Sequence, residues 1–250
     1  MHSKLFEVFG LPIYSYGVMM VVGFAVGIWR ARRVSKKRYG IEPERVIDIA
    51  LVVLVSSVIG ARTVYVWMDP YETWGHFFAV WDGGLSFHGG VVAALAAGYV
   101  YTRIAKLPFW SCVDLVVPSA AIGYALTRIG CFLRGCCYGG PTDLPWAVPT
   151  NHEGLLINAH PTQIYALLAG LLIFFILTRL ERMNRAPGFV FASYLGLYGV
   201  YRFLIEILRK GYTAEVWVYG LTHAQVVSIV MVLISAVALH FLYRMPARDD

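Results

Sequence analysis

Long runs of apolar residues alternate with short polar stretches along the whole chain. The hydrocarbon core of a bilayer, about 30 Å thick, requires about 20 apolar residues per helix. Runs that meet this length cover residues 13–30, 47–67, 85–105, 113–133, 160–179, 188–208 and 223–243. The pattern predicts an all-α integral membrane protein of about seven transmembrane helices, with residues 1–250 forming a single polytopic membrane domain.

Two segments between these runs have a different pattern. The aromatic-rich segment from Trp74 to Trp81 is typical of the membrane interface rather than of a span. Residues 134–159 contain Gly139-Gly140-Pro141 and few apolar runs. We expect this second segment to form a loop or small head outside the bilayer.

The composition agrees with a membrane class. Hydrophobic residues make up 58% of the 250 residues and charged residues 14%, which is too apolar for a soluble domain of this length. The net charge of +6 does not indicate nucleic acid as a partner, because the Lys and Arg residues lie mainly in the loops, where they direct topology.

Basic residues are concentrated on one side of the predicted helices. Of the 21 Lys and Arg residues, 14 fall in the loops of that side, seven of them between Arg30 and Arg45. The positive-inside rule then places the N-terminus outside and the C-terminus in the cytoplasm, which fits an odd number of spans. We therefore expect a multi-pass membrane protein whose C-terminus is cytoplasmic.

Ionisable and polar residues inside the predicted spans gather at one level. Such residues are costly in lipid and are functional candidates. All of those considered lie in the outer half: Tyr16, Arg62, His88, Arg128, His160, Gln163, Arg202, Glu206, His223 and Gln225. Arginines near helix ends also reach to headgroups, and histidines at helix starts also serve as anchors or caps. A one-sided cluster nevertheless favours a site facing the outer leaflet.

The residue types suggest how this site works. Arg128 and Arg202 suit a phosphate group, because guanidinium stays charged at low dielectric and donates paired hydrogen bonds. Glu206 follows Arg202 by four residues on one helix face, where it is expected to orient or neutralise that arginine. His88 lies among Ser86, Gly89 and Gly90, and imidazole is a side chain that can take a proton from a thiol or hydroxyl.

These residues occur within sequence strings that resemble one family. The strings are Trp81-Asp82-Gly83-Gly84-Leu85-Ser86-Phe87-His88-Gly89-Gly90, Arg128-Ile129-Gly130, His160-Pro161-Thr162-Gln163-Ile164-Tyr165, and Tyr198-Gly199-Val200-Tyr201-Arg202 with Glu206. Together they resemble the prolipoprotein diacylglyceryl transferases, over nearly the whole chain. The resemblance implies an enzyme that moves the diacylglyceryl group of phosphatidylglycerol onto the lipobox cysteine thiol of a preprolipoprotein. A thioether forms and glycerol 1-phosphate is released.

The resemblance also implies partners and residue roles. The enzyme would lie in the bacterial cytoplasmic (inner) membrane. Its substrates would be phosphatidylglycerol and a preprolipoprotein whose signal peptide is still inserted, both reached through the membrane lipids, and no cofactor or metal would be required. His88 would activate the thiol, and Arg128 and Arg202 would bind and polarise the phosphate. The headgroup region would include Tyr16, Arg62, Tyr198 and Glu206, with further candidates at Cys131, Cys136, His160, Gln163 and Gln225.

The chain departs from the family pattern at three positions. Cys131 stands where an Asn is usual, Cys136 where a Glu is usual, and Ala166 where a Glu usually closes the His160 string. These departures leave two alternatives open. In one, the same fold and phospholipid donor serve a different acceptor. In the other, the protein is a non-enzymatic transporter or binder of anionic lipid.

The cysteines themselves have several interpretations. Cys131, Cys136 and Cys137 are either simply small residues or an outward-facing disulfide of Cys131 with one of the other two. A zinc site that also uses His152 or His160 ranks below the disulfide, because the spacing matches no known zinc pattern. Cys112 is expected to be buried.

Overall fold

The computed structural model describes residues 4–8, 11–68, 77–78, 84–209, 211 and 214–246. Contacts divide the chain into two compact units. Unit 1 comprises Met1–Arg30 and Val113–Asp250, and unit 2 comprises Ala31–Cys112. The single-domain organisation stays a prediction. Most of the Trp74 to Trp81 segment lies outside the described residues.

Each predicted span contains a long α-helix. The helices are α1 (Ser15–Tyr39), α2 (Pro43–Met68), α3 (Phe87–Ile104), α4 (Phe109–Arg134), α5 (Thr162–Leu180), α6 (Phe189–Ile207) and α7 (His223–Leu242). Among the described residues, five helices are long and apolar enough to cross a membrane: α2, α4, α5 with its following turn, α6 and α7. The structure thus confirms a mainly helical protein with five helices able to span a membrane among its described residues, and the full count of seven spans stays a prediction.

One predicted boundary is wrong. The stretch from Arg30 to Arg45 is not mainly a loop, because α1 continues to Tyr39 and α2 begins at Pro43. Arg and Lys are good helix formers, and a helix that leaves lipid can continue into water. Hydropathy marks where the apolar stretch ends, which here precedes the end of the helix.

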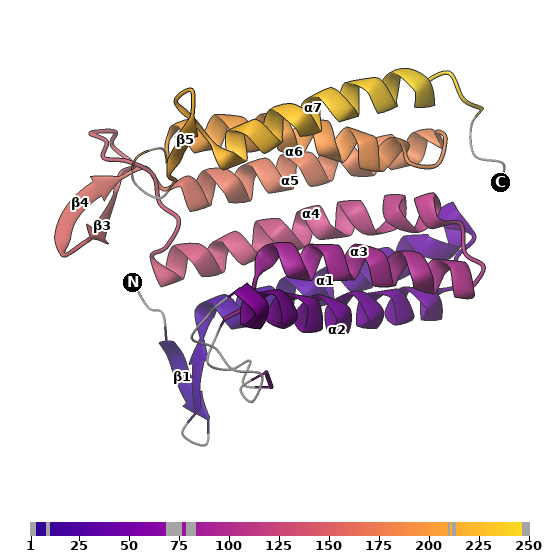
Figure 1. Ribbon diagram of the computed structural model, residues 1–250, viewed down its shortest axis with the longest axis horizontal. Helices are drawn as coiled ribbons and strands as arrows, with labels where there is room; N and C mark the ends of the chain where they lie inside the picture. The colour runs from indigo at the N-terminus through magenta and orange to yellow at the C-terminus, as the bar shows by residue number, and fades with distance from the viewer. Residues whose placement is uncertain are drawn as a thin grey trace. The chain divides into compact units, whose positions relative to one another are not determined.

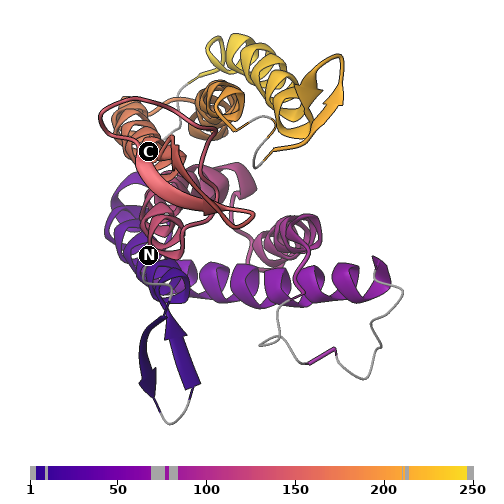
Figure 2. The ribbon, with the colours of Figure 1, turned by 90° about the vertical axis from the view of Figure 1, so that its left-hand side faces the viewer.

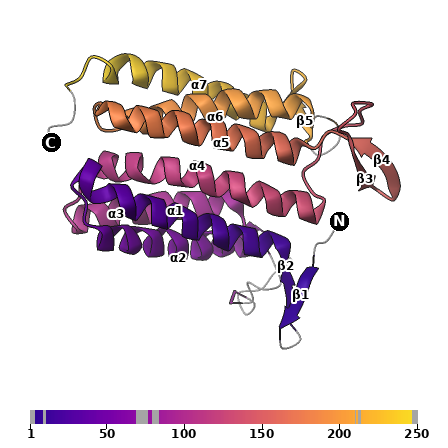
Figure 3. The same cartoon turned by 180° about the vertical axis from the view of Figure 1, so that it is seen from behind.

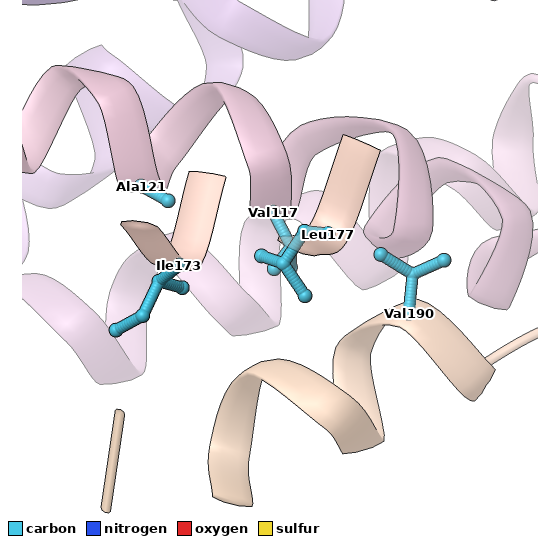
Figure 4. Close-up of a cluster of buried hydrophobic side chains, with 5 residues drawn as sticks. All are labelled: Val117, Ala121, Ile173, Leu177 and Val190. Carbon is cyan, nitrogen blue, oxygen red and sulfur yellow. The ribbon is translucent and has the colours of Figure 1, made fainter. Parts of the chain in front are cut away.

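Helices α4, α5 and α6 share an apolar core in unit 1. Val117 and Ala121 from α4 contact Ile173 and Leu177 from α5, and Val190 from α6 completes the cluster (Figure 4). All five side chains are buried. This packing fixes the three helices whose ends carry most of the polar candidates.

Three short hairpins supplement the helices. They pair β1 (Lys4–Val8) with β2 (Leu11–Tyr14), β3 (Val148–His152) with β4 (Leu155–Ala159), and β5 (Val216–Val218) with β6 (Leu221–Thr222). The second hairpin lies inside the predicted outer loop and turns at Glu153 and Gly154, whose φ angles are +50° and +90°. The prediction of all-α structure missed these strands, because each is only two to five residues long.

In unit 1, the β3–β4 and β5–β6 hairpins lie at one end of the helices. Figures 1 and 3 show that α4 runs toward this end, α5 starts from it, α6 returns to it and α7 leaves it. Figure 2 looks onto this end. The outer residues of α4, α5, α6 and α7 are therefore brought together, as the alternating directions of the predicted spans require.

Apolar side chains cover the outer faces of the helices. On α5, Leu168, Leu172 and Phe175 are each about 60% exposed and recur at helical spacing. A soluble protein rarely presents so continuous an apolar face. Such a face is suited to contact with lipid tails.

Unit 2 is built on a close crossing of α2 and α3. A Cβ atom at Gly60 would lie 2.6 Å from the carbonyl oxygen of Gly89, and one at Gly89 would lie 2.4 Å from that of Gly60. Only glycine allows the two backbones to approach this closely. The crossing therefore fixes the position of the first turn of α3, which carries His88.

Candidate functional site

A small pocket opens at the hairpin end of unit 1. It lies among the end of α4, the start of α5 and the end of α6. Its lining residues are Tyr124, Arg128, Cys137, Thr162, Ala166, Tyr201, Arg202, Ile205 and Arg209. Two predicted phosphate-binding residues, Arg128 and Arg202, thus line one pocket, and three arginines face it in total.

A buried carboxylate holds two of these arginines. Glu206 Oε2 accepts a hydrogen bond from Arg202 Nη1 at 2.5 Å and lies 3.6 Å from Arg209 Nη1. Its other oxygen, Oε1, accepts a bond of 3.1 Å from the hydroxyl of Thr222 at the start of α7. The predicted orienting contact between Glu206 and Arg202 is therefore present in the structure.

The third arginine has aromatic rather than acidic neighbours. The guanidinium of Arg128 lies 4.4 Å from the ring centroid of Tyr124, a cation–π contact. The Tyr124 hydroxyl lies 2.9 Å from that of Tyr201. Within the described part of the chain, Arg128 has no carboxylate partner, and its buried Nε has no hydrogen-bond acceptor. Its charge is available to an anion in the pocket.

The pocket therefore carries excess positive charge. Arg128, Arg202 and Arg209 contribute three positive charges, and Glu206 offsets one of them. Burial lowers the local dielectric and makes this charge more effective than it would be in water. By charge alone, a phosphodiester with one negative charge would balance part of this excess, and a phosphate monoester with two would balance it fully.

Backbone hydrogen bonds hold the chain after α4 against the start of α5 and the end of α6, beside the pocket. Gly140 N donates to the carbonyl oxygen of Leu208 at 2.7 Å, and Gly139 N donates to that of His160 at 3.0 Å. A Cβ atom at Gly139 would lie 2.7 Å from the Leu208 carbonyl oxygen. The glycines that suggested a loop are thus needed for close contact with the ends of α5 and α6.

Three cysteines, Cys131, Cys136 and Cys137, lie at this turn and are free thiols in the structure, which therefore does not contain the disulfide that was one interpretation of them. The sulfur of Cys136 is 3.5 Å from that of Cys137, and Arg128 Nη1 is 4.0 Å from the sulfur of Cys131. Hydrogen bonding with the other two thiols, together with the charges of Arg209 and Arg128, lowers the pKa of the Cys137 thiol. Cys112 is buried elsewhere, as expected.

The tyrosine candidates surround the same end of unit 1. Tyr198 packs edge-to-face against Tyr124, with ring centroids 5.8 Å apart. Tyr16 lies in the first turn of α1, close to α4: a Cβ atom at Gly130 would lie 2.9 Å from the Tyr16 Cα. Electrostatic interactions link Tyr16 with Arg128 and Cys131. Both tyrosines are therefore near the arginine pocket, although neither is among its lining residues.

Three other candidates have identifiable local partners. His160 precedes α5 rather than opening it, and its Nδ1 is 3.5 Å from the Tyr165 hydroxyl. Gln163 donates to the carbonyl oxygen of Cys136 at 2.6 Å. Gln225 forms the capping box of α7 with Thr222. These contacts assign each residue a supporting position, and their predicted substrate roles stay untested.

The remaining two candidates, Arg62 and His88, belong to unit 2. Arg62 is buried and donates to the carbonyl oxygens of Phe77 and Gly84, each at 3.1 Å. It therefore holds the chain that precedes α3. His88 follows the N-cap residue Ser86 and is exposed. Its accessibility suits a residue that meets a substrate.

Sequence reasoning missed several pocket residues, among them Tyr124, Tyr201 and Arg209. The spacing of three residues between Glu206 and Arg209 indicates a second ion pair at the end of α6. Tyr124 falls four residues before Arg128, the spacing that brings two side chains together on a helix. Both signals are present in the sequence.

Known proteins resemble this chain over most of its length. A family model described as prolipoprotein diacylglyceryl transferase matches residues 3–241. Proteins named phosphatidylglycerol–prolipoprotein diacylglyceryl transferase are similar to it in several bacteria. That of Clostridium tetani is 35% identical, over 84% of this chain and 86% of the relative. The protein of Geobacillus kaustophilus is 35% identical, over 90% of this chain and 86% of the relative. The protein of Vibrio cholerae is 33% identical, over 98% of this chain and 93% of the relative.

The length of these matches and the arginine pocket agree with the resemblance found in the sequence strings. The chain therefore belongs to the prolipoprotein diacylglyceryl transferase family.

Proposed function

We propose that this protein transfers the diacylglyceryl group of phosphatidylglycerol to the lipobox cysteine thiol of a preprolipoprotein. The single observation that carries the proposal is the pocket lined by Arg128, Arg202 and Arg209, of which only the last two pair with the carboxylate of Glu206, in a chain of this family. The names of its relatives contain both phosphatidylglycerol and prolipoprotein.

The leaving group accounts for the excess of positive charge. In phosphatidylglycerol the phosphate carries one negative charge. When the thiol sulfur attacks the diacylglyceryl carbon, the C–O bond to phosphate breaks and glycerol phosphate leaves with a second negative charge. Arginines fixed before the reaction stabilise this added charge without reorganising. The net charge of the pocket thus matches the product of bond cleavage better than the substrate, which is the condition for catalysis.

Residue roles follow from this chemistry and from the family. Arg128 and Arg202 bind the phosphate, and Arg209 shares Glu206 with Arg202. Tyr124 and Tyr201 form the aromatic wall beside Arg128. His88 activates the acceptor thiol, and Arg62 supports the chain leading to it through the Phe77 and Gly84 carbonyls.

The same proposal includes the arrangement in the membrane. All seven helices span a bacterial inner membrane, with the N-terminus outside and the pocket toward the outer leaflet. The basic residues at the end of α1, Lys36, Lys37 and Arg38, then lie on the cytoplasmic side. Phosphatidylglycerol enters laterally from the lipid, and the acceptor arrives while its signal peptide is still in the membrane.

Complementation tests the proposed function. The chain is expressed in a bacterium depleted of its own transferase, and lipoproteins are analysed by mass spectrometry for the diacylglyceryl group. Restored modification with wild-type protein, and its loss with His88→Ala, is the expected result. If the protein is well expressed in the membrane but no lipoprotein is modified, the proposal that a preprolipoprotein is the acceptor is contradicted. In that case, release of glycerol phosphate from phosphatidylglycerol by the purified protein indicates transfer to another acceptor, and headgroup binding without release indicates a lipid binder.

A further inference from the structure

Three cysteine sulfurs converge beside the arginine pocket. The sulfur atoms of Cys131, Cys136 and Cys137 all lie within 4.8 Å of one another, and the closest pair is 3.5 Å apart. Three thiolates bound to one zinc ion, with Zn–S bonds of about 2.3 Å, lie about 3.8 Å apart. Small side-chain rotations are therefore enough to bring all three sulfurs onto one ion.

The backbone is shaped to produce this convergence. Helix α4 ends at a turn in which Gly135 has φ +77° and donates to the carbonyl oxygen of Cys131 at 3.1 Å. Cys137 has φ +65°, a conformation that residues other than glycine rarely adopt. Such a backbone persists only where its surroundings enforce it, and it is typical of functional sites.

Two side chains from the first turn of α5 enforce the turn. Thr162 Oγ1 donates to the carbonyl oxygen of Cys137, and Gln163 Nε2 donates to that of Cys136, each at 2.6 Å. Both side chains are buried. They hold the two adjacent cysteines from behind, in the way that outer residues orient the ligands of a metal site.

Among the described residues, no histidine or carboxylate joins the three sulfurs as a fourth ligand. The two histidines considered from the sequence have other neighbours: His152 Nδ1 is 3.0 Å from the Tyr138 hydroxyl, and His160 Nδ1 is 3.5 Å from that of Tyr165. Cys137 itself lines the pocket together with Arg128 and Arg202. An ion bound by the three thiolates would thus have its remaining position on the pocket side.

We propose that Cys131, Cys136 and Cys137 bind one zinc ion, and that its fourth coordination position holds the acceptor thiol as a thiolate next to the phosphate-binding arginines. The metal part rests on the cysteine geometry alone, and the thiol-activating part rests on the function proposed above. Three soft thiolates favour zinc over calcium or magnesium, which prefer oxygen ligands. A disulfide would use only two of the three cysteines.

The reaction balances without any further reactant. Zinc binding releases the protons of the three cysteines, and the acceptor thiol loses its own proton when it coordinates, because a metal-bound thiol is deprotonated. That proton is released to water. The thiolate sulfur then forms a bond to the diacylglyceryl carbon, the carbon–oxygen bond to phosphate breaks, and glycerol phosphate departs with the electron pair. The neutral thioether binds zinc weakly and leaves.

Metal binding is tested first, without reference to activity. The full chain is purified in detergent with a reductant, its zinc content is measured, and Co²⁺ is then added to metal-free protein. We expect one equivalent of zinc, and thiolate-to-cobalt absorption with the visible bands of a tetrahedral site. Cys131→Ser, Cys136→Ser and Cys137→Ser each remove these signals, and Cys112→Ser, a change at a buried cysteine outside the cluster, leaves them intact. Failure of reduced wild-type protein to bind either metal overturns the proposal.

The cysteine variants could lose metal binding because they misfold, so a variant that keeps all three thiols is also tested. Gln163→Ala removes the bond to the Cys136 carbonyl and should weaken Co²⁺ binding by about 10- to 100-fold, the usual effect of losing an outer partner. Unchanged affinity would mean that the turn is not built for a metal. A disulfide among these cysteines, found by thiol labelling of membranes before reduction, would also overturn the proposal.

Assays of diacylglyceryl transfer with and without zinc distinguish a failure of this inference from a failure of the proposed function. Chelation of zinc, or any cluster variant, should reduce diacylglyceryl transfer by about 100-fold or more, the effect expected from losing thiol activation, and added zinc should restore the chelated wild-type protein. Full transfer without zinc overturns the inference and leaves the proposed function intact. Stoichiometric zinc in a protein that transfers nothing supports the metal site and contradicts the proposed function.

Discussion

Arg202 and Glu206 lie one turn apart on α6 and form an ion pair in which Nη1 and Oε2 are 2.5 Å apart. The carboxylate is buried, and the hydroxyl of Thr222 on its other side fixes its orientation. Arg202 is therefore held at the wall of the pocket before any substrate binds. An arginine that is already fixed in place can stabilise a departing phosphate without first reorganising.

Removal of this guanidinium should abolish most transfer. We expect Arg202→Ala to reduce kcat/KM about 100- to 1000-fold, the range for one fixed donor to a developing anion. Arg202→Lys should be intermediate, since it keeps the charge but not the paired geometry. The measurement is transfer of labelled diacylglyceryl from phosphatidylglycerol vesicles to a lipobox peptide. Arg32→Ala, at an exposed arginine of α1, is the control. Full activity of Arg202→Ala would refute the phosphate role.

Neutralising the carboxylate should affect binding and turnover in opposite directions. Glu206→Gln can still accept the Thr222 hydrogen bond but leaves Arg202 and Arg209 without their anionic partner. The extra positive charge should lower KM for phosphatidylglycerol, and the loss of orientation should lower kcat by about tenfold or more. Steady-state kinetics on vesicles separate the two constants. A raised KM with unchanged kcat would show that Glu206 contacts the substrate rather than the arginines.

The crossing of α2 and α3 should tolerate no side chain at Gly89. In Gly89→Ala the new methyl group would lie 2.4 Å from the Gly60 carbonyl oxygen and 2.7 Å from the Val64 side chain. Overpacking of this kind costs about 1–3 kcal/mol. Gly98→Ala on the same helix is the matched control, because its nearest neighbour would be Val53 Cγ2 at 3.8 Å. Thermal unfolding in detergent should separate the two variants, and equal stability would contradict the close crossing.

Much of the fold can be predicted from the lengths of the apolar runs and from the spacing of residues along the chain. Apolar run length located every long helix, and alternation of helix direction predicted that the polar ends of α4 to α7 meet. The Arg202–Glu206 pair follows from a spacing of four residues. These features are local or periodic, so they can be recognised without knowing how the helices pack.

The rest of the pocket depends on contacts that periodicity does not encode. Tyr124 is one of sixteen tyrosines, and its role beside Arg128 becomes visible only when α4, α5 and α6 are packed. The positive φ at Cys137 depends on hydrogen bonds from Thr162 and Gln163, 25 and 27 residues away in the sequence from their respective acceptors. Long-range constraints of this kind turn a Cys-rich string into a three-sulfur cluster.

Asp114 should stabilise α6 without taking part in transfer. The cap residue of α6, Gly188, has no side chain, and Asp114 from α4 takes over its role. The Asp114 carboxylate accepts from Gly188 N at 2.8 Å and from Phe191 N at 2.9 Å, and is fully buried. Asp114→Ala leaves two buried N–H groups without these acceptors and should cost about 2–4 kcal/mol, whereas Asp114→Asn keeps one acceptor oxygen and should cost less.

Thermal unfolding in detergent measures this loss, with Asp143→Ala, at an exposed aspartate, as the control. Asp114 is separated from Arg128 by fourteen residues of α4, about 21 Å along the helix axis. Transfer at a temperature where the variant is still folded should therefore be close to that of the wild type. A variant that unfolds normally but has lost transfer would instead place Asp114 in the reaction, and would mean that the pocket at the hairpin end is not the whole of the site in unit 1.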